Sequence, residues 1–267
     1  MNHSHHVTTT IPSTNGAIAQ GEDIRRNLLL AALPSAELER LLPSLESVPL
    51  EDGMPIHEPH EPITRVYFPT NGIISLVSEM AEGTVEVGTI GREGMTGLPL
   101  VLRATTMPSR AFVQVPGHAF CMRDDDLVAA MRGSATFERL LFRYVLALYD
   151  QTAQHAACNR VHTLEERCAR WLLMTHDRVE GDEFPLTHEF LAFMLGVHRP
   201  AVTIAAGALQ KAGVIRYSRG KVTVLDRDAL ERAACTCYTI IARRAAELLD
   251  VEASPAGGSA GYATERN

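Results

Sequence analysis

The sequence lacks any segment suited to entering or crossing a membrane. The first residues, MNHSHHVTTTIPSTNG, have no apolar run behind a basic start, so we expect no signal peptide. No later stretch approaches the roughly 18 consecutive apolar residues of a spanning helix. We therefore expect a cytoplasmic protein without a membrane partner. Its 267 residues, of which 46% are hydrophobic, are enough for two modest domains.

A disulfide or metal framework is also missing. The five cysteines are an odd number without CxxC spacing, which fits reduced thiols in a cytosolic protein. They are Cys121, Cys158, Cys168, Cys235 and Cys237. The last two are the one close pair, and residues two apart on a helix point in different directions, so they would chelate poorly. We interpret all five as small buried hydrophobes and expect no metal.

Motifs of catalysis are absent as well. The sequence contains no GxSxG, no Walker loop and no His-Asp-Ser arrangement with supporting context. We therefore expect that the protein is not an enzyme.

Acidic residues are missing from one long segment. The whole chain carries a net charge of −7, yet residues 190–225 contain no Asp or Glu. The cations there are Arg199, Lys211, Arg216, Arg219 and Lys221, so the segment is +5 and the rest of the chain is −12. A local basic face on an acidic molecule is typical of a site-directed DNA binder. By charge alone, a solvated basic surface would look the same.

The residue pattern predicts an α+β fold in five parts. Residues 1–22 and 251–267 have the composition of disordered tails, although the HSHH of the first could also take up metal. Residues 23–124 begin with short helices and continue with β-branched and aromatic runs between Gly-bearing turns, which predict an antiparallel β-roll, a jelly-roll-like double-stranded β-helix. Residues 125–160 form a long helix, and residues 161–250 hold a second domain with an extra C-terminal helix.

The long helix carries a narrow apolar seam. Phe137, Leu141, Tyr144 and Leu148 recur at spacings of three or four. Such a seam suggests pairing with a second copy of the chain, so these residues are the expected dimer interface. The alternative is that this side of the helix packs on its own domain.

Two short helices with a glycine between them are expected in residues 187–211. Thr187 caps the first, HEFLAFML, whose apolar residues lie on one side. Gly196 ends it, at the tight connection where a helix-turn-helix needs a conformation that side chains disfavour. The second helix begins at His198, with Pro200 in its first turn, where the missing N–H matters little.

A basic hairpin follows the second helix. VIRYSRGKVTVL has the pattern of two short strands around SRGK, a tip that offers Arg219 and Lys221 to a phosphate backbone. The order of helix, glycine turn, helix and basic hairpin predicts a winged helix-turn-helix that binds double-stranded DNA.

The order of the predicted parts and one long motif resemble the Crp/Fnr family of bacterial transcription regulators. A β-roll comes first, then a long helix, and then the motif PLTHEFLAFMLGVHRPAVTIAAGALQKAGVIRYSRGKVTVLD. The resemblance covers residues 28–225 and is most specific over residues 196–215. It implies a homodimer on a palindromic site, a β-roll that senses a small effector, and RNA polymerase as a partner. By resemblance Arg199 reads a base edge, most often guanine. The expected DNA-binding residues are Thr187, His198, Arg199, Pro200, Thr203, Arg219 and Lys221.

The sequence departs from the family at two positions of the recognition helix. Pro200 stands where many members have an acidic residue, and Ile204 where the best-studied branch has a second arginine. We therefore expect a palindromic target other than the operator of that branch.

The effector pocket of the family is also altered. Cyclic nucleotide binders of this fold have Gly-Glu and, about ten residues later, Arg-Ser-Ala or Arg-Thr-Ala. The nearest equivalents here are Arg92-Glu93-Gly94 and Ser109-Arg110-Ala111, with a longer segment between them and the arginine and serine transposed. The expected effector-binding residues are therefore Arg92, Glu93, Ser109 and Arg110. Either Arg92 and Arg110 cradle an anion, or Arg110 pairs with Glu93 on the surface of the roll. We predict no cofactor. The resemblance leaves a cyclic nucleotide open as a bound effector.

A second class of function also fits the composition. The protein could be a β-roll that binds a ligand or a metal, with a helical C-terminus that mediates assembly. His57 and His60 suggest such a metal site, but the HEPHEP loop lacks paired HxH ligands and is better interpreted as solvated. Beyond the hairpin, Asp226 caps one further helix, RDALERAACTCYTIIARRAAELLD, which could pack on the winged domain or extend a dimer contact.

Overall fold

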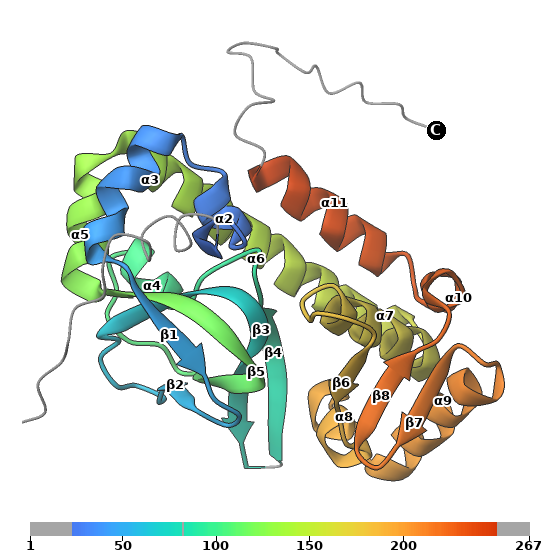
Figure 1. Ribbon diagram of the computed structural model, residues 1–267. Helices are drawn as coiled ribbons and strands as arrows, with labels where there is room; N and C mark the ends of the chain where they lie inside the picture. Colours follow the sequence, from blue (N-terminus) through green and yellow to red (C-terminus); the bar gives the residue numbers. More distant parts are fainter. Residues whose placement is uncertain (1–22, 82, 250–267) are drawn as a thin grey trace, which may run out of the picture.

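The computed structural model describes residues 23–81 and 83–249, which form an antiparallel β domain and a helical domain joined by one long helix (Figure 1). The two expected tails, residues 1–22 and 251–267, lie outside the described residues. The α+β architecture and the predicted order of its parts are confirmed. Among the described residues, no single helix has both the length and the apolar character to cross a membrane.

The β domain is one curved antiparallel sheet. Its strands are β1 (Glu46–Leu50), β2 (Pro55–His57), β3 (Arg65–Met80), β4 (Gly83–Ile90) and β5 (Arg110–Arg123). The order is β1-β5-β3-β4, and β2 also pairs with β5. Irregularities in register between residues 69 and 74 of β3 bend the long strands, which lets the sheet roll over its own apolar side chains.

Short helices cover one end of this sheet. They are α2 (Leu28–Ala31), α3 (Ser35–Leu41), the 3-10 turn η1 (Leu42–Ser44), α4 (Leu98–Val101) and α5 (Asp124–Gly133). Together with the start of the long helix, they enclose a core that includes Leu29, Val66, Phe68, Met95 and Met122. His57 is buried at the end of β2, whereas His60, Glu61 and Pro62 are exposed, so the prediction of a solvated HEPHEP loop is correct for its second half and wrong for His57.

The single helix expected over residues 125–160 is two helices. α5 ends at Gly133, and α6 (Ala135–Val161) begins after Ser134, whose extended backbone breaks the helix. The Ser134 hydroxyl then accepts a hydrogen bond from the backbone N–H of Phe137 at 3.0 Å and caps α6.

The predicted dimer seam of α6 faces the protein's own core. Phe137, Leu141 and Tyr144 are 1%, 0% and 4% exposed and pack against the β domain, and Leu148 is half-buried. The Tyr144 hydroxyl also donates to the carbonyl of Met95 at 3.0 Å. The assignment of Phe137, Leu141 and Tyr144 to a dimer interface was therefore wrong, because they pack on the same domain, and the assignment of Leu148 stays a prediction.

The helical domain begins with α7 (Leu164–His176), whose capping box joins Thr163 and Glu166. It continues with β6 (Glu183–Pro185), α8 (His188–Leu195), α9 (Arg199–Lys211), β7 (Ile215–Ser218) and β8 (Lys221–Val224). The strands form a small sheet in the order β6-β8-β7. The core of the helical domain includes Trp171, Leu172, Leu191, Val202, Leu209 and Val222.

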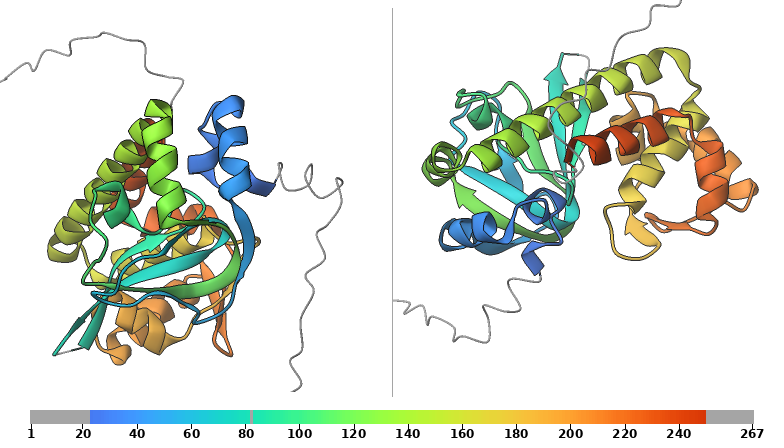
Figure 2. Two further views of the ribbon diagram at one scale, coloured as in Figure 1. Left: turned by 90° about the vertical axis from the view of Figure 1, so that its left-hand side faces the viewer. Right: turned by 90° about the horizontal axis from the view of Figure 1, so that it is seen from above.

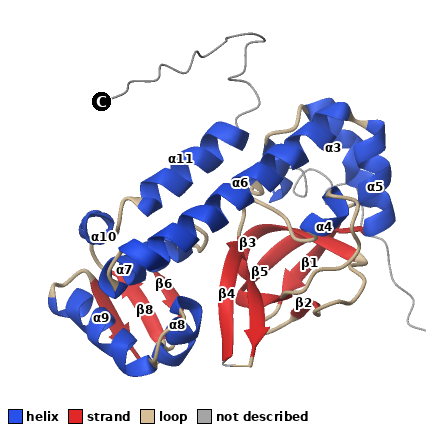
Figure 3. Ribbon diagram, turned by 180° about the vertical axis from the view of Figure 1, so that it is seen from behind, coloured by secondary structure: helices blue, strands red, loops and turns tan. Residues whose placement is uncertain are grey.

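The C-terminal helix is also broken. In place of one continuous helix, α10 (Arg227–Ala233) and α11 (Cys237–Leu249) are separated by an extended turn at Ala234. Figures 2 and 3 show α11 lying along α6, to which it is held by an ion pair between Arg244 Nε and Asp150 Oδ2 at 2.7 Å. Arg227 and Tyr238 both bond Asp177 at the end of α7, which holds α10 and α11 on the helical domain.

A buried ion pair connects the two domains. Arg178, just after α7, donates from Nη2 and Nε to Oε1 of Glu93 at 2.7 and 2.9 Å. Burial alone would raise the pKa of Glu93, but the adjacent guanidinium holds it below its ordinary value. Because both partners are largely withdrawn from water, separating the domains here would leave two unpaired charges.

Candidate nucleic-acid interface

α8 and α9 form a helix-turn-helix. Thr187 Oγ1 accepts from the backbone N–H of Phe190 at 3.0 Å and starts α8. Gly196 ends α8 with φ +64°, a left-handed conformation that other residues adopt at a cost in energy. The chain then bends by 106° into α9, within the range typical of helix-turn-helix units.

One face of α9 is open to solvent. Val202, Ala205, Ala206 and Leu209 are buried and anchor the helix to α7 and α8. The opposite side exposes Arg199, Pro200, Thr203, Ile204 and Gly207. Ile204 is 76% exposed, which is unusual for a large apolar side chain in the middle of a helix.

Contacts with α8 and the hairpin hold the N-terminal half of α9 in place. Thr203 Oγ1 lies 3.1 Å from both the carbonyl of Arg199 and Nδ1 of His188. The His188 ring packs against Tyr217 with 4.2 Å between centroids, and the Tyr217 hydroxyl donates to the carbonyl of Leu186. Burial, and then the charge of Arg199, lower the pKa of His188, which favours its neutral form. These contacts connect both helices to the hairpin.

The hairpin between β7 and β8 carries a basic tip. Ser218 pairs with Lys221, so Arg219 and Gly220 are the two turn residues, with φ of +49° and +78°. Positive φ at both positions is typical of a type I′ turn, in which an arginine is strained. Arg219 is exposed to solvent in this turn.

All seven residues expected to bind DNA are exposed: Thr187, His198, Arg199, Pro200, Thr203, Arg219 and Lys221. The sequence did not reveal the partner of Lys221. Its Nζ lies 2.7 Å from Oε1 of Glu183, which belongs to β6, far from the hairpin in sequence. This exposed pair is weak and screened by salt, so a phosphate can compete for Lys221.

Two of the expected effector residues pair with other side chains. Glu93 is paired with Arg178, and Arg110 Nε pairs with Glu58 Oε1 at 3.3 Å. Ser109 is buried, and Arg92 is exposed near the domain junction. The pair between Arg110 and Glu93 is therefore wrong, because each has a different partner, and the anion cradle of Arg92 and Arg110 stays a prediction.

A cavity of about 220 Å³ lies instead between the two domains, walled by β4, α6, α7 and α8. Arg170 is 4% exposed there, and its Nε has no hydrogen-bond partner. His155 Nε2 is also buried without one. Glu86 accepts from Trp171 Nε1 at 3.2 Å, and burial raises the pKa of its carboxyl to about 7. No local pattern in the sequence points to this group, because its residues come from separate elements.

The comparisons agree with this geometry. Residues 166–233 match the family model of the Crp-like helix-turn-helix domain. A regulator of the crp/fnr family from Eubacterium rectale is 21% identical with a TM-score of 0.57, covering 78% of this chain and 98% of that chain. A CRP-family regulator from Thermus thermophilus is 18% identical with a TM-score of 0.60, covering 70% and 96%.

A third solved structure, described as a cyclic nucleotide binding protein from Ruegeria pomeroyi, is 22% identical with a TM-score of 0.57, covering 80% of this chain and 96% of that chain. A comparison with curated proteins gives no match. The chain therefore contains a Crp-like helix-turn-helix domain, and its overall fold is similar to that of solved Crp/Fnr regulators.

Proposed function

We propose that the protein binds a palindromic DNA site as a homodimer, with one α9 helix in each of two successive major grooves. The observation that carries this proposal is the open face of α9, which is exposed and free of acidic residues and begins with Arg199. In a dimer of this kind, the two half-sites lie about 34 Å apart, one turn of the duplex.

Each exposed residue has a role in this proposal. Arg199 donates to the O6 and N7 acceptors of a guanine. Ile204, one turn further along α9, packs on a thymine methyl, which is the one apolar group at the edge of the major groove. Arg219 and Lys221 contact the phosphate backbone beside the groove.

The dimer forms through the far side of α6 from the core. Phe142, Leu146 and Tyr149 are 46%, 42% and 69% exposed. With the exposed Ala153 they follow spacings of 4, 3 and 4, the pattern of a coiled-coil seam. α11 lies along residues 147, 150, 151, 153 and 154 of α6, so it borders the seam at Ala153 and leaves Phe142, Leu146 and Tyr149 uncovered.

The effector, in this proposal, is a small anion held in the cavity between the domains. Arg170 and His155 offer it buried donors without partners. A ligand there would contact both β4 and α8, so it could alter the position of the helix-turn-helix relative to the β domain. We also propose that the DNA-bound protein contacts RNA polymerase, and we assign no residues to this contact.

Selection of bound duplexes from a random DNA pool tests the function. We expect the purified protein to enrich a palindrome with half-sites about 10 base pairs apart, centre to centre. Enrichment of no sequence, with binding that depends on salt alone, would show a nonspecific basic surface instead.

A further inference from the structure

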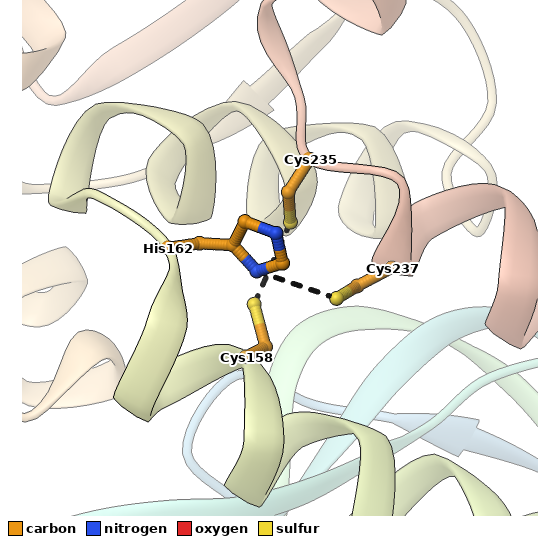
Figure 4. A group of neighbouring side chains, drawn as sticks. All are labelled: Cys158, His162, Cys235 and Cys237. Carbon is orange, nitrogen blue, oxygen red and sulfur yellow. Dashed lines mark hydrogen bonds between the residues drawn. The ribbon is translucent and has the colours of Figure 1, made fainter. Parts of the chain in front are cut away.

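Three cysteines and a histidine converge where α6 meets α10 and α11. They are Cys158, His162, Cys235 and Cys237, and Figure 4 shows the three sulfurs gathered around the imidazole ring. The cysteines are buried and form an apolar cluster separate from the cores of both domains. Cys158 and His162 lie one turn apart at the end of α6, and Cys235 and Cys237 lie at the break before α11.

The expectation that Cys235 and Cys237 would diverge was wrong because it assumed a continuous helix. Ala234 has an extended backbone, so Cys235 precedes α11 and its side chain is free of helical spacing. The two cysteines can therefore approach the same point, Cys235 from the loop and Cys237 from the first residue of α11. The spacing of Cys158 and His162, four residues apart on a helix, was the sequence signal for the other half of the cluster.

The distances match one tetrahedral ion. The four ligand atoms all lie within 4.8 Å of one another. Cys158 Sγ is 3.5 Å from Cys235 Sγ, and Cys237 Sγ is 3.5 Å from His162 Nδ1. Tetrahedral ligands at about 2.3 Å for sulfur and 2.0 Å for nitrogen from a common centre are about 3.5 to 3.8 Å apart.

The surroundings suit a thiolate site. Three thiolates and a neutral imidazole around a divalent cation leave one net negative charge. Arg170 and Arg167 lie close enough to Cys158 for charge interaction, and the Nε of each is buried without a hydrogen-bond partner. Gln154 Nε2 is 3.1 Å from Cys237 Sγ and can donate to it as an outer-shell partner.

We propose that Cys158, His162, Cys235 and Cys237 bind one zinc ion. Zinc is the ion for which a closed tetrahedral Cys3His set is typical. The ion would fasten the start of α11 to the end of α6, beside the Arg227–Asp177 ion pair that holds α10 on α7. Its role would be structural, because four protein ligands leave no open coordination position.

The test is the metal content of the full-length chain, purified without an affinity tag and with His3, His5 and His6 changed to Ser to remove binding by the tail. We expect about one zinc ion per chain, measured by inductively coupled plasma mass spectrometry. Exchange for cobalt should give the visible absorption of a tetrahedral site with thiolate ligands. Cys158→Ser and Cys235→Ser should each lower the zinc content at least tenfold.

Two variants separate metal loss from misfolding. Cys121→Ala removes a buried thiol outside the cluster and should keep the full zinc content. His162→Cys supplies a fourth thiolate at a half-buried position and should also keep it. Less than a tenth of an equivalent of zinc, together with no cobalt spectrum, would overturn the proposal. So would an unchanged zinc content in Cys235→Ser, or a Cys158–Cys235 disulfide in place of the metal.

Discussion

Two adjacent residues of α6 should have opposite effects when each is replaced by alanine. Leu141 is 0% exposed within one chain, and Phe142 is 46% exposed on the proposed dimer seam. A phenylalanine can bury roughly 200 Å², so about 90 Å² of Phe142 remains to be covered by the partner. At roughly 25 cal/mol/Å², this is about 2 kcal/mol per chain and about 4 to 5 kcal/mol per dimer.

Phe142→Ala should therefore weaken the dimer about a thousandfold, as measured by sedimentation equilibrium over a range of protein concentrations. Leu141→Ala should lower the free energy of unfolding by about 2 to 5 kcal/mol, because it opens a cavity in the core. We expect it to leave the dimer dissociation constant nearly unchanged. The reverse outcome, a dimer broken by Leu141→Ala and unaffected by Phe142→Ala, would refute the assignment of the two faces.

Two further predictions concern the hairpin and the domain junction. Arg219→Asn should raise the free energy of unfolding by about 0.5 to 1 kcal/mol, because asparagine tolerates positive φ. The same change should lower DNA affinity and reduce the slope of affinity against salt concentration by about one phosphate contact. A loss of stability in urea titrations would contradict the strain at this turn. Glu86→Gln should change the free energy of unfolding little below pH 4.5 and raise it by up to about 3 kcal/mol above pH 7. The reason is that the pKa of Glu86 is about 7 in the folded state and 4.5 in the unfolded chain. Ionisation above pH 4.5 therefore stabilises the unfolded chain of the wild type, and glutamine removes this effect. Equal effects of Glu86→Gln at pH 4.5 and pH 8 would show that the carboxyl ionises freely in the fold.

Local patterns were enough to predict the helix-turn-helix and its hairpin. The cap at Thr187, the glycine at 196 and the SRGK turn each depend on a few neighbouring residues, and the structure places all three as expected. The pattern of α6 was ambiguous because two apolar sets lie one residue apart, at Leu141 and Phe142. Only the packing of the β domain decides which set is buried.

Features that join distant segments could not be predicted in this way. The pair between Arg178 and Glu93 and the pair between Lys221 and Glu183 both connect residues far apart in sequence. The cysteine cluster depends on the helix break at Ala234, where the sequence has neither glycine nor proline to mark it. Periodicity continues through the break, which is why a single helix was predicted.

The central claim is that the open face of α9 reads base edges in a DNA groove. The measurement that tests it most directly is the affinity of wild type and Arg199→Ala for the selected palindrome and for its single-base variants, at one fixed salt concentration. We expect Arg199→Ala to lose about 1 to 3 kcal/mol on the palindrome and to stop discriminating at one base position in each half-site. If Arg199→Ala instead binds every duplex as wild type does, with the same preference at each position, α9 does not read DNA.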